Sequence, residues 1–183
     1  MERKRLFVAV ELPKEVKKEL SIICDHFAKR ELFVGRCTRP ENLHITLKFI
    51  GSVCEGVVEK IDRDLKNIYI DACKATLHSL GVLPTRRISR ILFVGLDCFC
   101  LPILAKQIEH NLSWLVKEEE REFKNHITLA RIKKIENKED FLYAVDNFGV
   151  PPLEFEIKEF VLKQSEITPE GPVYTDLSRY QLY

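Results

Sequence analysis

The tetrapeptide His-Ile-Thr-Leu occurs twice in this chain of 183 residues, first at residues 44–47 and again at residues 126–129. The offset of 82 residues (126 − 44) is too long for a solenoid repeat, and two copies are too few for an array. A chain of this length can bury one full hydrophobic core without needing a second domain. We therefore expect a single domain of residues 1–183 that contains an internal repeat, roughly residues 1–85 and 86–183.

The same order of elements surrounds both copies: strand, helix, strand, helix, strand. Apolar residues recur every three or four positions in the helical segments, as Val16, Leu20 and Ile23 do. Gly51 is expected to end the strand that carries the first tetrapeptide. The predicted fold class is α+β, a bilobal duplicated unit with two antiparallel sheets facing a central cleft and helices on the outside. The predicted strands are residues 6–10, 43–50, 72–80, 91–97, 123–132, 154–162 and 173–183.

Side chains on a strand alternate between its two faces, so the first tetrapeptide has a polar face and a core face. His44, Thr46 and Lys48 are expected on the polar face, while Ile45 and Leu47 point to the core. A strand of this kind presents an imidazole and a hydroxyl side by side.

The second tetrapeptide follows the same alternation and places His126 beside Thr128. Arg131 lies five positions after His126 and has the opposite parity. We therefore expect Arg131 to lie past the regular part of the strand, or its side chain to curl round the strand end. If a twofold axis relates the halves, the two His–Thr pairs face each other across a groove.

Two imidazoles on opposite sides of a tetrahedral group can act as general acid and general base. The unperturbed histidine pKa of about 6.5 allows one ring to be neutral and the other charged near neutral pH. Threonine hydroxyls can hold phosphate oxygens, and a cation such as Arg131 or Lys48 can stabilise the developing charge. Hydrolysis of a 2′,3′-cyclic phosphate needs such a set, and it requires no metal and no cofactor.

A single histidine on a strand is more often a structural residue than a catalyst. Here the histidine and the threonine are repeated together with the apolar positions, whereas core packing alone requires only the apolar positions to recur. The pair therefore favours catalysis. His26, His78 and His110 lie outside the repeat and are expected on the surface of helices or strands.

The formal net charge of +1 provides no overall positive field of the kind that dominates binding to long duplexes. A short RNA end or fragment is the better-matched nucleic-acid partner. Local basic clusters are present, and most are expected to be solvated surface. They are Arg36 with Arg39; Arg86, Arg87 and Arg90; Arg121 with Lys124; and Arg131 with Lys133 and Lys134.

The N-terminal residues predict no signal peptide or membrane span, and the cysteine spacing predicts no metal site. The apolar run at residues 6–10 is too short for a signal peptide or a membrane span. We expect a cytoplasmic monomer without membrane association or an obligatory protein partner. No CxxC pair is present, so reduced thiols are expected rather than a zinc site. The cysteines are Cys24, Cys37, Cys54, Cys73, Cys98 and Cys100.

Motifs along nearly the whole chain carry a family resemblance: RLFVAV at residues 5–10, RPENLHITLKFIG at 39–51, FKNHITLAR at 123–131, LKQS at 162–165 and GPVY at 171–174. With these motifs the sequence resembles the 2H phosphoesterase superfamily, and within it the LigT-like RNA 2′,3′-cyclic phosphodiesterases, also labelled 2′-5′ RNA ligases. The resemblance implies a bilobal α+β fold with both motifs in a central cleft. It also implies metal-free hydrolysis of the cyclic ester to a 2′-phosphomonoester.

The resemblance further implies roles for individual residues. His44 would donate a proton to the departing O3′, and His126 would accept one from the attacking water. Thr46, Thr128 and Arg131 would hold the phosphate. Run backward, the same site would join a cyclic phosphate to a 5′-hydroxyl in a 2′-5′ linkage, with RNA ends, tRNA fragments among them, as partners. The residues alone do not decide which histidine is the acid.

The chain departs from the family pattern at two places. Asn125 stands where the family usually has a proline before the second histidine. Residues 81–84 read Gly-Val-Leu-Pro where the family has Gly-x-Phe-Pro. Neither departure touches the motif residues.

Other functions compete with RNA-end hydrolysis. One is a catalytically idle RNA-binding module that keeps the fold, although such a module needs no acid and base pair. Another is a cyclic phosphodiesterase for small nucleotides, such as a cyclic phosphate of ADP-ribose, which only a range of substrates can distinguish. A metallophosphatase would require an Asp/His cluster, and none accompanies these histidines in the sequence.

Overall fold

The computed structural model describes residues 3–84, 90–118 and 120–183. Arg86 and Arg87, predicted as part of a basic cluster, lie outside these ranges. Within them, no helix combines the length and the apolar character that a membrane span requires. The helices are α1 (Lys14–Lys29), α2 (Val58–Leu65), α3 (Cys100–Asn111) and α4 (Lys138–Asp146). The strands are β1 (Arg3–Glu11), β2 (Val34–Cys37), β3 (His44–Cys54), β4 (Cys73–Pro84), β5 (Arg90–Asp97), β6 (His126–Lys134), β7 (Glu154–Ile157), β8 (Glu159–Thr168) and β9 (Gly171–Gln181).

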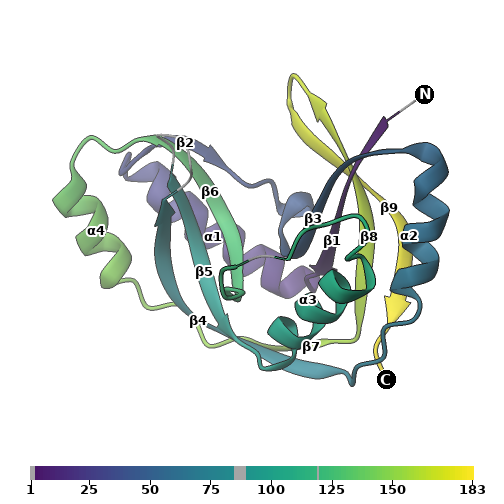
Figure 1. Cartoon of the computed structure of the whole chain (residues 1–183). Coiled ribbons are helices and arrows are strands. Elements are labelled where there is room, and N and C mark those ends of the chain that lie inside the picture. The colour runs from purple at the N-terminus through teal and green to yellow at the C-terminus, as the bar shows by residue number, and fades with distance from the viewer. Residues whose placement is uncertain (1–2, 85–89, 119) are drawn as a thin grey trace.

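The described strands form one curled antiparallel sheet in the order β7-β4-β5-β6-β3-β1-β8-β9, with β2 also paired to β6 (Figure 1). The strands that carry the two tetrapeptides, β3 and β6, are neighbours in the middle of this order. A single recorded pair, Ile45 with Ile127, joins them. The α+β class is confirmed, and the two expected sheets are the halves of one sheet that meets at this pair.

The strand order is symmetric about the junction of β3 and β6. β1 pairs with β3 of its own repeat and with β8 of the other, while β5 pairs with β6 of its own repeat and with β4 of the other. The helices cross in the same way, since α1 packs against β6 and α3 packs against β3. Each half of the sheet therefore combines elements from both sequence repeats.

The α1 helix shows how the apolar pattern produces this packing. Pro13 precedes its first turn, where a missing N–H costs no hydrogen bond. The predicted apolar face is buried: Leu20 and Phe27 are fully covered, and Val16 is 3% exposed. Burial of each side chain of this size contributes roughly 1.5–3 kcal/mol. The face that predicted the helix thus also fixes it against the sheet.

The structure differs from the sequence prediction in several strand boundaries, such as β4, which continues past the predicted residue 80 to Pro84, and in one additional strand. Gly51 does not end the strand: β3 continues to Cys54, and Gly51 has a φ of 90°, which glycine adopts readily. Ile50 has no partner in the β1–β3 register, so the chain passes through a bulge here. The predicted strand at residues 154–162 is interrupted at Lys158 between β7 and β8. The short strand β2 was not predicted, because its first three residues are exposed and carry no apolar alternation.

Four cysteines form disulfides, which corrects the expectation of reduced thiols. Cys24 with Cys37 links α1 to β2, and Cys73 with Cys100 links β4 to the first residue of α3. The Cα atoms lie 6.2 and 6.5 Å apart, within the range that a disulfide spans. The sequence separations of 13 and 27 residues give no motif, so only the fold reveals these pairs.

Candidate active site

The two histidines of the tetrapeptides lie on one face of the sheet. Ile45 and Ile127 pair across the junction and are completely buried in the core. Because side chains alternate along a strand, His44, His126 and the two threonines point to the opposite face, where all four are partly exposed. In a regular antiparallel register through this pair, the two histidines are diagonal neighbours, which lie roughly 7–8 Å apart. The strands β3 and β6 would therefore line the predicted groove side by side.

The hydrogen bonds of His44 define which ring nitrogen carries the proton. Nδ1 lies 2.7 Å from the carbonyl oxygen of Asn42, which can only accept, so Nδ1–H donates. Nε2 lies 2.9 Å from the Thr46 hydroxyl, which can donate to it. In the neutral ring, Nε2 is therefore the nitrogen that carries the lone pair, and it lies on the threonine side.

Aromatic rings enclose His44. The centroids of Phe7 and Tyr174 lie 5.1 and 5.4 Å from the imidazole centroid. Removal from water lowers the pKa of His44 to about 4, although the hydrogen bond to Asn42 and the negative charge of Glu11 act in the other direction. At neutral pH this imidazole is uncharged in the substrate-free protein.

His126 repeats two of the contacts of His44, the backbone acceptor and the phenylalanine. Its Nδ1 donates to the carbonyl oxygen of Lys124 over 2.8 Å, two residues upstream as in the first repeat. Phe93 packs against the ring at a centroid distance of 5.7 Å. Gly81 makes room for Phe93, because a Cβ at this position would lie 2.3 Å from the phenyl ring. Each histidine therefore has a backbone acceptor and a phenylalanine from the adjacent strand.

Both tetrapeptides end in a β-bulge. In β3, Val8 pairs with Lys48 and Ala9 with Thr46, which leaves Leu47 without a partner. In β6, Leu129 has no partner in the same way, because Thr128 pairs with Phe93 of β5 and Ala130 pairs with the preceding residue of β5. A bulge inserts one extra residue and reverses the side-chain alternation beyond it.

The bulge places Lys48 on the covered face, so its predicted position beside His44 is wrong. Lys48 is 4% exposed, forms an ion pair with Glu109 of α3 and donates to the carbonyl oxygen of Lys117 over 3.1 Å. Phe49 takes the exposed face instead and contacts Phe7 at a centroid distance of 6.2 Å. Lys48 therefore belongs to the packing between sheet and helix.

The equivalent bulge brings Arg131 onto the exposed face that His126 and Thr128 share, which corrects the predicted opposite parity. Its charge acts on Tyr174: burial raises the pKa of that phenol, and the positive charge of Arg131 opposes the rise. Tyr174 also contacts His44. Arg131 therefore shares the exposed face of His126 and Thr128, and its charge is felt at a ring that packs against the first histidine.

A buried charge network that the sequence prediction missed lies beside His44. Lys163 is 5% exposed and contacts Glu11 and Asp176, each at 2.5 Å. Lys17 contacts the second oxygen of Glu11 at 2.7 Å. These cations lower the pKa of Glu11 against the opposing effect of its burial, and Glu11 pairs with His44 across the strands. The sequence carried one indication of this network: Lys163 directly follows the apolar run at residues 160–162 of a predicted strand.

Two of the remaining predicted residues lie beside the site: His78 covers Gly95, the cross-strand partner of His126, and Arg36 pairs with Arg131. His26, His78 and His110 are exposed, as predicted. A hollow of about 650 Å³ adjoins Phe49 and is lined also by Arg121, a member of a predicted basic cluster. Within the described ranges, one group of three potential metal ligands occurs, and it contains neither histidine of the tetrapeptides.

Comparison with known proteins gives a consistent family assignment. The model of the family described as LigT like Phosphoesterase matches residues 10–93 and 103–174. A protein of Methanocaldococcus jannaschii named RNA 2′,3′-cyclic phosphodiesterase is 33% identical over 93% of this chain and 96% of its own length. One of the same name from Archaeoglobus fulgidus is 31% identical over 97% and 99%. The crystal structure of E. coli LigT in its apo form superposes with a TM-score of 0.78 at 25% identity, covering 100% of this chain and 99% of that one.

Proposed function

The chain belongs to the LigT-like phosphoesterase family, and from this premise we propose that it is a hydrolase that opens RNA 2′,3′-cyclic phosphodiester ends to 2′-phosphomonoesters. One observation carries the proposal: two His–Thr pairs lie on one face, on either side of the Ile45–Ile127 pair, and each histidine donates its Nδ1–H to a backbone carbonyl and packs against a phenylalanine. A binding module would not need two imidazoles oriented alike.

In the proposed mechanism, His126 accepts a proton from the attacking water and His44 donates one to the departing O3′. The neutral state of His44 in the free protein means that the substrate must prepare it for this role. An anionic phosphate beside the ring stabilises the imidazolium and raises its pKa. The roles exchange in the reverse reaction, which would form a 2′-5′ linkage from a cyclic phosphate and a 5′-hydroxyl.

Three further side chains would hold the phosphate. The hydroxyls of Thr46 and Thr128 would donate to non-bridging oxygens, and Arg131 would neutralise the charge that develops in the transition state. Each proton transfer contributes roughly 10² to 10⁴ in rate, so the two histidines together would supply on the order of 5 to 11 kcal/mol.

We propose that the reaction needs no metal ion. In the described ranges, His44 and His126 share no site with two further His, Cys, Asp or Glu side chains close enough to bind one ion together. The proposed acid and base also leave no step that requires a metal-bound water. We further propose that the protein works as a cytoplasmic monomer; light scattering should then give the chain mass of 21.4 kDa.

The decisive experiment uses an oligoribonucleotide that ends in a 2′,3′-cyclic phosphate, in the presence of EDTA. The expected product carries the phosphate on the 2′-oxygen, identified by ³¹P NMR. His44→Ala and His126→Ala should each lower the rate at least 100-fold. His110→Ala, which changes an exposed histidine of α3, should leave the rate unchanged. A 3′-phosphate product, loss of activity with EDTA, or full activity of both variants would each contradict the proposal.

The choice between RNA ends and small cyclic nucleotides depends on the hollow beside Phe49. Lys117 and Arg121 line this hollow together with Glu118 and Glu120, and Arg121 would contact a second phosphate of a longer chain. We therefore propose RNA ends as the substrate. Arg121→Ala should raise KM for an oligoribonucleotide and not for a cyclic mononucleotide. An equal effect on both substrates would favour the small-nucleotide activity.

A further inference from the structure

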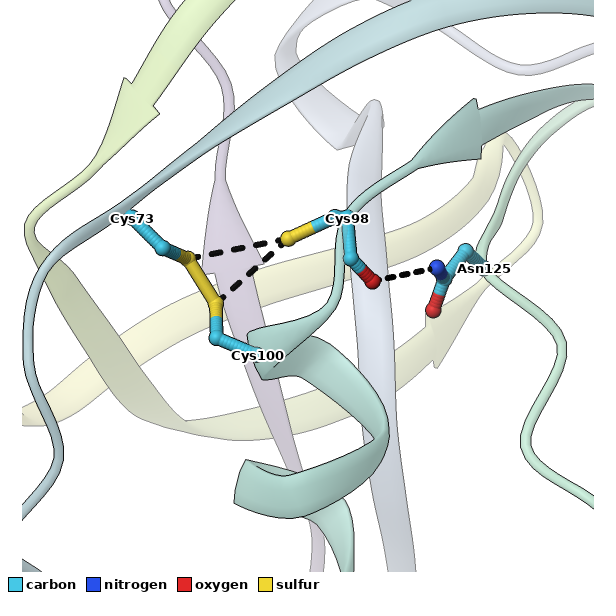
Figure 2. The surroundings of a disulfide bond; sticks show 4 residues. All are labelled: Cys73, Cys98, Cys100 and Asn125. Carbon is cyan, nitrogen blue, oxygen red and sulfur yellow. Dashed lines mark hydrogen bonds between the residues drawn. A yellow bond between two sulfur atoms is a disulfide. The ribbon is translucent and has the colours of Figure 1, made fainter.

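A cluster of three buried cysteines lies at the base of α3, away from the tetrapeptides in sequence (Figure 2). Cys73 on β4 is bonded to Cys100, the first residue of α3. The thiol of Cys98, which is the residue after β5, lies between them: its Sγ is 3.6 Å from Cys73 Sγ and 3.4 Å from Cys100 Sγ. None of the three residues is more than 9% exposed.

Three sulfurs in mutual contact can hold only one disulfide at a time. Cys73 and Cys100 have no S–H while they are bonded, so Cys98 carries the thiol of the cluster. This thiol touches both sulfurs of an existing disulfide from the side, whereas exchange requires an approach along the S–S axis, so the contact supplies proximity and the Cys98 side chain must turn before it can attack. The cluster therefore differs from the Cys24–Cys37 disulfide, beside which the described structure records no third sulfur.

We propose that Cys73, Cys98 and Cys100 form an internal thiol–disulfide exchange site. In the exchange, Cys98 loses its proton, its side chain turns into line with the Cys73–Cys100 bond, and its sulfur attacks Cys73 Sγ. The Cys73–Cys98 bond forms as the Cys73–Cys100 bond breaks, and Cys100 leaves as a thiolate that takes up the proton. One disulfide and one thiol are present before and after the step, so no oxidant or reductant is consumed.

The position of Cys100 favours it as the leaving group. It occupies the first position of α3, a helix of 12 residues whose N-terminus has no side-chain cap. The partial positive charge of a helix N-terminus stabilises an anion placed there. A thiolate on Cys100 is therefore stabilised as it departs, and a better-stabilised leaving thiolate leaves faster.

Burial confines the exchange to the cluster. Cys100 is completely buried, while Cys73 and Cys98 are 7% and 9% exposed. An external thiol therefore has only slight access to any of the three sulfurs, whereas Cys98 is in contact with both partners. The three sulfurs are consequently shielded from thiols in solution while they remain in contact with one another.

Disulfide mapping of the full chain tests the proposal. The protein is prepared without reductant, equilibrated at pH 8, quenched with acid, alkylated and digested with pepsin at low pH, which prevents rearrangement during digestion. Tandem mass spectrometry then distinguishes Cys98 from Cys100. We expect both Cys73–Cys100 and Cys73–Cys98 linkages, with a matching loss of Cys98 alkylation. Cys24–Cys37 should appear as one linkage and serves as the internal control.

Two serine variants of the cluster identify which cysteine forms each linkage. Cys98→Ser should leave only the Cys73–Cys100 linkage, and Cys100→Ser only Cys73–Cys98. If either variant fails to fold, the mapping of the wild-type chain still decides. Exclusive Cys73–Cys100 linkage with fully alkylated Cys98 would overturn the proposal. So would three alkylated thiols in the native protein, including the case in which added Zn²⁺ protects them, since the cluster would then be a metal site.

Discussion

Leu47 and Leu129 are the unpaired residues of two equivalent bulges, one in β3 and one in β6, three positions after each histidine. Both side chains remain in the core, at 4% and 0% exposure. The extra residue reverses the side-chain alternation beyond it, so the residue two positions further on returns to the face of the histidine. In the first repeat that residue is Phe49, and in the second it is Arg131. The duplicated backbone thus supplies an aromatic ring on one side and a cation on the other.

Substitution of Arg131 and of Lys48 should separate catalysis from stability. Arg131→Ala should lower kcat/KM by roughly 10- to 1000-fold, because it removes a charge that stabilises the transition state. Its side chain is exposed, so the free energy of unfolding should hardly change. Lys48→Met should instead destabilise the fold by about 3–5 kcal/mol, because Glu109 keeps a largely buried charge without this partner. Urea denaturation and steady-state kinetics measure the two effects.

The double variant Lys48→Met/Glu109→Leu provides the control. It removes both charges and should regain most of the stability that Lys48→Met loses. If Lys48→Met lowered kcat/KM of the folded protein as much as Arg131→Ala, Lys48 would act on the substrate after all.

The sequence could predict the repeat, the α+β class and the alternation up to Thr46 and Thr128. It could not predict the parity of Lys48 or Arg131, because a bulge depends on the pairing of two strands and leaves no mark in one strand alone. The same limit applies to Phe7 and Phe93, which reach the histidines from neighbouring strands. The disulfides likewise join residues that only the fold brings together. Local sequence patterns therefore predict the helices and strands, whereas the side chains around the two histidines depend on how the strands pair.

The depressed pKa of His44 makes a prediction about stability. The pKa is about 4 in the folded chain against 6.5 for an unperturbed histidine, so between these pH values the unfolded state binds more protons. The free energy of unfolding should therefore fall on acidification from about pH 6.5 to about pH 4, by up to about 3 kcal/mol from this residue. Denaturation of wild type and His44→Gln across this range gives the difference, in which other titrating groups cancel. A constant difference would contradict the assigned pKa.

Binding of the reaction product should reverse this shift. A 2′-nucleotide places an anion beside His44, which stabilises the imidazolium, so we expect its pKa to rise by more than one unit. NMR titration of ¹⁵N-labelled imidazoles with and without 2′-AMP measures the change. Arg131→Ala serves as the comparison, since weaker phosphate binding should reduce the effect at the same ligand concentration. If the pKa of His44 stayed near 4 in the complex, His44 could not be the proton donor at neutral pH.

Gly81 should be required for the position of Phe93. In Gly81→Ala the new methyl group would meet the phenyl ring at 2.3–2.7 Å, so the ring must move, and His126 would lose its aromatic neighbour. We expect a destabilisation of roughly 1–3 kcal/mol and a lower kcat. Gly149→Ala is the matched control, because its added Cβ would meet nothing within 4 Å. Thermal unfolding and kinetics of both variants test the prediction, and equal behaviour of the two would refute it.

The cysteine cluster should also influence His126, through a short chain of contacts. The carbonyl oxygen of Cys98 accepts a hydrogen bond from the Asn125 amide at 2.7 Å, and the Asn125 carbonyl accepts one from the Leu96 N–H at 3.2 Å. Figure 2 shows Asn125 directed toward the cluster. We therefore expect a movement of Cys98, when the disulfide changes, to reach the residue before His126.

Reduction of the cluster should consequently shift the NMR resonances of His126 more than those of His44, because the hydrogen bond from Asn125 to Cys98 leads to the residue directly before His126. The starting protein is the Cys24→Ser/Cys37→Ser variant, because the disulfide it removes lies on β2, which pairs with β6 and would respond to dithiothreitol as well. Asn125→Ala removes the connecting amide and should abolish the difference between the two histidines. Equal shifts of both rings, or a response that survives in Asn125→Ala, would show that the hydrogen bond to Cys98 does not couple the cluster to His126. This test observes the imidazole directly, so its outcome does not depend on which substrate the enzyme hydrolyses.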